Sequence, residues 1–144
     1  MKLMKHAHSS LFLMEMMVVI LFFSLTSAIC VHLFAQSYQT AKHSEELTNS
    51  VLQAESAAEL YKSAAGDLRQ TADFLAAQWE EDKGLLAIYD ASWQIVQQDG
   101  DYLLTMTEVQ GGPVPTAEII VSALDGREIY RLTVKAYQPG GDRL

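Results

Sequence analysis

The sequence predicts an α+β protein in which a long N-terminal transmembrane helix extends into an amphipathic helix that packs on a small antiparallel β-sheet. Three observations support this fold class. An apolar run follows a short basic segment, apolar residues then recur at helical spacing, and the rest of the chain alternates between strand-like segments and turns. We divide the 144 residues into a basic leader (1–10), a transmembrane helix (11–35), an amphipathic helical region (36–80) and an antiparallel sheet domain (81–144).

The run over 11–35 is long enough to span a bilayer. Apart from Glu15 and His32, it holds only apolar residues, Ser, Thr and one Cys. A helix rises about 1.5 Å per residue, so this segment can cross a hydrocarbon core of about 30 Å, and it exceeds the roughly 7–15 residues of a signal-peptide core. Lys2 and Lys5 precede the run and predict a cytoplasmic N-terminus. We therefore expect a single-pass cell-membrane protein whose C-terminal domain lies outside the cytoplasm.

Two cleaved signals are weaker alternatives to this anchor. A lipoprotein signal would end at Cys30, but bulky Ile29 replaces the small residue required before that cysteine. An ordinary signal peptidase would cut after Ala35, where Leu33 and Phe34 make a poor site. Because Cys30 is the only cysteine and lies inside the apolar run, we expect no internal disulfide in the outer domain.

Glu15 is the most informative residue of the apolar run. An ionised carboxylate in hydrocarbon is costly, so a glutamate inside a membrane segment is a functional hypothesis by default. The alternative is that Glu15 lies at the cytoplasmic interface and stays hydrated. Composition alone leaves both interpretations open.

The residues around Glu15 favour the functional interpretation. Residues 10–20 read SLFLMEMMVVI, and this segment resembles the class III signal of type IV prepilins. That signal has a short basic leader, a small residue at the cleavage point and a glutamate at the fifth mature position. By this resemblance Leu11 is the first mature residue and Glu15 the fifth. The chain departs from the pattern at Ser10, because prepilins normally carry Gly immediately before the cut.

The resemblance implies a minor pilin or pseudopilin, a structural subunit of a type IV pilus-like or type II secretion filament. The segment 11–35 lacks the proline that many major pilins carry, which favours a minor subunit. The implied partners are other pilin-like subunits, prepilin peptidase and the cytoplasmic membrane. The implied processing site is Ser10 and Leu11, and Glu15 is implied in filament assembly through the N-terminal amine of a neighbouring subunit. If Ser10 blocks cleavage, that amine does not exist and the subunit stays in the membrane.

Apolar residues recur at alternating spacings of four and three beyond the membrane segment. This stripe comprises Leu47, Val51, Ala54, Ala58, Tyr61, Ala65, Leu68, Ala72, Leu75 and Trp79. Such a stripe is typical of a coiled coil or of a helix that packs on its own sheet, and the strands that follow favour the second. Gly66 and Asp67 are expected to break or kink the helix, with Asp67 capping a second helical segment.

Strand-like segments make up the C-terminal part of the chain. They cover 93–98, 102–110, 117–124 and 128–138, with Asp-Gly turns at 99–100 and 125–126. The last segment places one set of residues on one face (Tyr130, Leu132, Val134 and Ala136) and a polar set on the other (Arg131, Thr133 and Lys135). This alternation predicts an antiparallel sheet with one buried face.

We expect no enzymatic activity, no cofactor and no nucleic-acid partner. Beyond the leader, the two histidines, His32 and His43, lie in or just after the membrane helix, so no nucleophile–base pair can be proposed. His6 and His8 lie in the leader and suggest a basic tail more than a metal site. Acidic turn residues lack the spacing of an EF-hand and suit turn chemistry (Asp99, Asp101, Asp125 and Asp142). The net charge of −8 disfavours phosphate contacts.

Two function classes therefore remain. The first is the filament subunit, which would also place the protein in a surface filament. The second is a membrane-tethered extracytoplasmic binding or sensor module that is never processed or assembled. An anchored enzyme has no support from any residue of the sequence.

Overall fold

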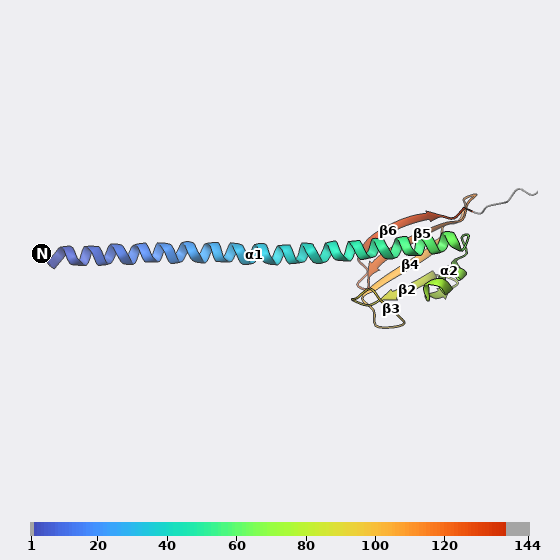
Figure 1. Cartoon of the computed structure of the whole chain (residues 1–144), viewed down its shortest axis with the longest axis horizontal. Coiled ribbons are helices and arrows are strands. Elements are labelled where there is room, and N and C mark those ends of the chain that lie inside the picture. The colour runs from blue at the N-terminus through green and yellow to red at the C-terminus, as the bar shows by residue number, and fades with distance from the viewer. Residues whose placement is uncertain (1, 138–144) are drawn as a thin grey trace, which may run out of the picture. The chain divides into compact units, whose positions relative to one another are not determined.

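The computed structural model describes the backbone of residues 2–137 and the side chains of residues 10–137. The chain divides into two compact units, one that ends at His43 and one that begins at Ser44. Helix α1 (Lys2–Ser63) contributes residues to both (Figure 1). The fold class is the α+β class expected from the sequence, with a long apolar helix and a small antiparallel sheet.

The first unit consists of the N-terminal part of α1. Every described side chain from Ser10 to His43 is exposed. Among the described residues, α1 is the one helix long and apolar enough to cross a membrane. Ser24 donates its hydroxyl proton to the carbonyl of Ile20 (2.8 Å) and Thr26 to that of Phe22 (3.0 Å). These polar side chains are therefore satisfied within the helix, as a lipid environment requires.

The second unit contains a sheet of antiparallel strands. The strands are β1 (Gln78–Glu80), β2 (Gly84–Tyr89), β3 (Ile95–Val96), β4 (Tyr102–Glu108), β5 (Thr116–Ala123) and β6 (Glu128–Lys135). Their order is β1-β2-β4-β5-β6, and β3 pairs with the end of β2 that β1 does not reach (Figure 1). Each strand therefore pairs with a strand close to it in sequence, and only the short β3 is bypassed, where β2 pairs directly with β4.

One face of this sheet packs against α1 and against helix α2 (Leu68–Leu75) (Figure 1). From α1 the core receives small residues and one large one: Ala54, Ala57, Ala58 and Tyr61. From the strands it receives every second residue, including Leu85, Ala87, Leu104, Met106, Ile119 and Val121. Burying such a branched or Met side chain stabilises the fold by about 1.5–3 kcal/mol, so the period-two pattern decides which face turns inward.

The predicted break in the helical stripe is confirmed. α1 ends at Ser63, and the chain then passes through Ala65 and Gly66, which have φ angles of 52° and 89°. Asp67 caps α2 by accepting hydrogen bonds from the backbone N–H of Arg69 (2.9 Å) and of Gln70 (3.2 Å). The prediction that the helix packs on its own sheet is also confirmed, because residues of both helices belong to the core.

The predicted stripe is wrong at two of its residues. Trp79 lies in β1, and Ala65 is exposed in the connection between the helices.

The extended strand β2 was not predicted, because its sequence GLLAIY has apolar residues on both faces and lacks the expected alternation. Leu86 and Ile88 lie on its outer face and are half-buried. A short apolar run of this kind does not distinguish a strand from other buried structure.

The predicted strand over 93–98 is also wrong for most of its length, since β3 holds only Ile95–Val96. The preceding residues form a turn in which the Asp90 carboxylate accepts hydrogen bonds from the N–H of Ser92 (2.8 Å) and of Gln94 (3.0 Å). Trp93 has a φ of 60°, which no strand residue adopts. The side-chain–backbone bonds of Asp90 thus override the β propensity of the segment.

The C-terminal hairpin agrees with the prediction. β5 and β6 pair from Thr116↔Lys135 to Ser122↔Glu128, and Gly126 turns the chain with a φ of 90°. Along β6, Val134 is buried while Arg131 and Lys135 are exposed. The structure ends β4 at Glu108 and β6 at Lys135, so both strands are shorter than expected. Gln138, the expected end of the last strand, lies outside the described residues.

Candidate functional site

The residues implied in processing and assembly all lie in the first unit. Ser10, Leu11 and Glu15 belong to α1, and their side chains are exposed. The Ser10–Leu11 peptide bond is therefore part of a helix near its start. A peptidase would have to unwind the first turns of α1 to reach this bond.

Glu15 has apolar surroundings on the surface of α1. It lies in a shallow groove together with Leu11, Met14, Val18 and Val19. Within the described part of the chain, its carboxylate has no hydrogen-bond or ion-pair partner. In hydrocarbon such a group is stabilised only if a cation or several donors come from another molecule.

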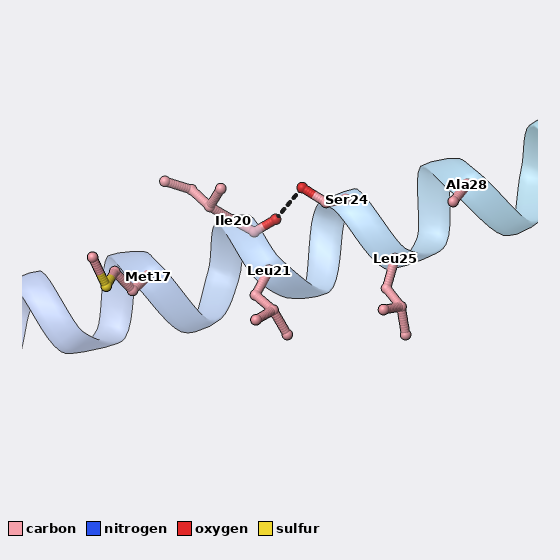
Figure 2. A pocket seen from close by; sticks show the side chains of 6 residues that line it. All are labelled: Met17, Ile20, Leu21, Ser24, Leu25 and Ala28. Atoms are coloured by element: carbon pink, nitrogen blue, oxygen red, sulfur yellow. Dashed lines mark hydrogen bonds between the residues drawn. The ribbon is translucent and has the colours of Figure 1, made fainter.

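A second shallow groove runs along the next turns of α1 (Figure 2). It is lined by Met17, Ile20, Leu21, Ser24, Leu25 and Ala28. The Ser24 hydroxyl is turned back to the carbonyl of Ile20, so the groove presents an almost wholly apolar surface. Ser24 and Ala28 are four residues apart and small, which allows another helix to approach closely.

The second unit contains a polar cluster that sequence reasoning missed. The two carboxylate oxygens of Glu46 accept hydrogen bonds from the Tyr102 hydroxyl (3.1 Å) and from the Arg127 guanidinium (3.3 Å). The Glu46 side chain is only 15% exposed. Burial and the bond to Glu46 raise the pKa of Tyr102, so the phenol remains a hydrogen-bond donor into more alkaline solution than an exposed tyrosine does. We call these three residues the Glu46 cluster.

A sequence signal for this cluster existed. Glu46, Ser50 and Ala54 follow one another at spacings of four, so Glu46 lies on the buried side of α1. The apolar stripe in the sequence starts instead at Leu47, which is 41% exposed. A glutamate on an inward face needs partners, and that requirement would have pointed to donors on the strands.

Aromatic residues connect the Glu46 cluster to the turn after β2. The ring of Trp93 stacks on that of Tyr102, with centroids 4.1 Å apart and planes 12° apart. Trp93 also lies near Tyr89, at 6.2 Å between centroids. The stacking accounts for the left-handed backbone of Trp93, because the contact compensates for a conformation that costs roughly 1–2 kcal/mol.

A further hollow lies between α2 and β1 and is lined by Arg69, Asp73, Trp79 and Glu81. The Arg69 guanidinium lies over the Trp79 ring, 5.8 Å from its centroid. Arg69 thus covers the aromatic surface that a flat ligand would use. The hollow combines opposite charges around a covered ring and does not select one class of ligand.

The acidic turn residues and the histidines form no metal site in the part of the chain that the structure describes. No three His, Cys, Asp or Glu side chains converge there on a possible metal position. Asp125 instead accepts a hydrogen bond from the N–H of Arg127 (2.9 Å) within the hairpin turn. His6, His8 and Asp142 lie outside the described side chains.

Comparison with family models, with curated proteins and with solved structures found no match to this chain.

Proposed function

We propose that this chain is a minor pilin or pseudopilin, a structural subunit of a type IV pilus-like or type II secretion filament. The observation that carries this proposal is Glu15, an unpaired carboxylate on an exposed apolar helix, within the prepilin-like segment 10–20. A single carboxylate at this depth is costly for an isolated membrane helix. It is favourable where a neighbouring subunit supplies the missing positive charge.

The proposed partner of Glu15 is the N-terminal amine of an adjacent subunit, released by prepilin peptidase at Ser10–Leu11. An ion pair in an apolar bundle fixes the axial register of two helices, because each charge is strongly disfavoured without the other. The groove formed by Met17, Ser24 and Ala28, among others, gives the adjacent helix an apolar surface to pack on. Because Lys2 and Lys5 precede the apolar run, we place the N-terminus in the cytoplasm and the sheet domain outside it.

A second function is favoured by one residue. Ser10 replaces the glycine that prepilins carry before the cut, and an uncleaved chain has no amine at Leu11. The protein would then act as a membrane-tethered extracytoplasmic module. The intact mass and N-terminal sequence of protein extracted from its native membrane separate the two: a chain that starts at Leu11 supports the filament, and an intact leader supports the module.

The assembly role of Glu15 has a direct test. We expect Glu15→Ala to insert into the membrane normally but to abolish incorporation into filaments, because breaking a buried ion pair costs roughly 3–5 kcal/mol. Filament and membrane fractions are compared by immunoblotting after shearing.

Glu55→Ala is the matched control, since it removes an exposed carboxylate from α1 within the second unit. It should leave incorporation unchanged. Normal incorporation of Glu15→Ala would refute the register role of Glu15.

A further inference from the structure

Within the second unit, α1 is held on the sheet unevenly along its length. Between 54 and 61, four side chains are at most 4% exposed: Ala54, Ala57, Ala58 and Tyr61. Between 44 and 53, only Ser50 is buried, whereas Leu47 and Leu52 are 41% and 56% exposed. Because stabilisation follows buried apolar area, the later stretch is held far more strongly than the earlier one.

The earlier stretch depends on one side chain for its polar contacts with the strands. Glu46 binds Tyr102 and Arg127, as described above. Ser50 and Thr48 donate their hydroxyl protons to carbonyls of α1 itself, those of Glu46 (2.7 Å) and Ser44 (2.8 Å). Among the described residues, Glu46 is thus the only member of 44–53 whose side chain hydrogen-bonds to the sheet or its loops.

The partners of Glu46 come from separate parts of the sheet. Tyr102 is the first residue of β4, and its ring stacks on Trp93 in the turn after β2. Arg127 lies in the turn between β5 and β6 and is half exposed. The turn that holds Trp93 and the turn that holds Arg127 each have their own backbone hydrogen bonds. Loss of the Glu46 contacts would leave these bonds intact.

We propose that the Glu46 cluster is a releasable latch for residues 44–53 of α1. When the latch opens, this stretch separates from the sheet while residues 54–61 stay packed. The opened stretch adds about 15 Å to the part of α1 that the sheet does not hold. The inference concerns contacts within the second unit and does not depend on the proposed filament function.

Hydrogen exchange of the full chain in lipid nanodiscs tests the latch. Tyr102→Phe removes one hydroxyl and keeps the ring that stacks on Trp93. A helical stretch that has left the sheet loses the packing that stabilises it, so its backbone hydrogen bonds open more often. We therefore expect amides of 44–53 to exchange about three- to tenfold faster in Tyr102→Phe, which is the factor that one lost hydrogen bond produces, with 54–61 unchanged. Arg127→Gln should accelerate the same amides.

Glu59→Gln is the matched control on the same helix. It breaks the exposed pair between Glu59 and Lys62 (2.9 Å), and exchange over 44–53 should stay as in the natural chain. The proposal is overturned if Tyr102→Phe and Arg127→Gln both leave 44–53 unchanged. It is equally overturned if either variant accelerates 44–53, 54–61 and β4 together, since that pattern indicates a general loss of stability. Arg127 lies in a half-exposed turn, so its variant keeps the test decisive even if Tyr102→Phe fails to fold.

Discussion

At the scale of single residues, the hydroxyls of Tyr61 and Tyr89 are notable because both are buried without a hydrogen-bond partner among the described residues. Burial raises the pKa of Tyr89 from 10.0 to about 12. Burial, and secondly the charge of Glu108, also raise the pKa of Tyr61. Both phenols therefore stay neutral in the folded chain at a pH where the unfolded chain ionises them.

This difference predicts a loss of stability in alkali. Unfolded Tyr89 releases its proton near pH 10, whereas folded Tyr89 keeps it until about pH 12, so rising pH favours the unfolded state. The contribution of Tyr89 is complete below pH 10 and is lost toward pH 12. We expect the loss of this contribution to lower the free energy of unfolding by about 2–3 kcal/mol between pH 10 and pH 12. Denaturant titrations followed by circular dichroism from pH 9 to pH 12 measure it.

Tyr89→Phe is the control for the alkaline prediction. At neutral pH this variant should be at least as stable as the natural chain, because it removes a polar atom that has no partner. Its stability should fall less steeply above pH 10. Parallel pH profiles for the two proteins would show that Tyr89 is not the group responsible.

At the scale of elements, the connection between α1 and α2 limits which side chains fit. Gly66 has a φ of 89°, and a Cβ placed there would lie 2.6 Å from the Cβ of Pro115. We expect Gly66→Ala to lower the free energy of unfolding by about 2–4 kcal/mol. Roughly 1–2 kcal/mol of this comes from the left-handed backbone, and the rest from overpacking against Pro115. Thermal or chemical unfolding monitored by circular dichroism measures the loss.

Gly126→Ala separates the two contributions. Gly126 has nearly the same φ of 90°, but nothing lies within 4 Å of a Cβ built there. This variant should lose only the backbone contribution of roughly 1–2 kcal/mol. Equal losses at both glycines would mean that Pro115 moves aside at little cost.

The elements also show how far the sequence determines this fold. The helix break at Gly66, the Asp67 cap and the hairpin at Gly126 were predictable because each depends on local backbone chemistry. Strand β2 was not, because its outer residues Leu86 and Ile88 are apolar as well. For the candidate sites, the sequence marked Glu15, whereas the Glu46 cluster joins residues 56 and 81 positions apart. Only the folded sheet brings such residues together.

At the scale of the whole molecule, the hydrophobic core formed by the described side chains lies in the second unit and begins at Ala54. We therefore expect a chain that starts at Ser44 to fold without the preceding residues and to show a cooperative thermal transition. A chain that starts at Ala64 should not, because it lacks Tyr61 and the alanines that cover the sheet. Removing one large buried aromatic side chain alone costs about 3–5 kcal/mol.

Circular dichroism and the spread of amide signals in an NMR spectrum measure both truncated chains. If the chain from Ser44 lacks a cooperative transition, the first unit contributes to folding in a way that its exposed side chains do not explain. If the chain from Ala64 folds cooperatively, the sheet and α2 form a sufficient core by themselves.

Both tryptophans of the chain, Trp79 and Trp93, belong to the second unit, in contact with Arg69 and Tyr102 respectively. Intrinsic fluorescence excited near the tryptophan band therefore reports on the sheet domain alone, even when the protein is embedded in lipid or assembled with other chains that lack tryptophan. The stacked Trp93 ring gives an optical signal beside the Glu46 cluster. A single cuvette experiment can thus follow the sheet domain without any added dye.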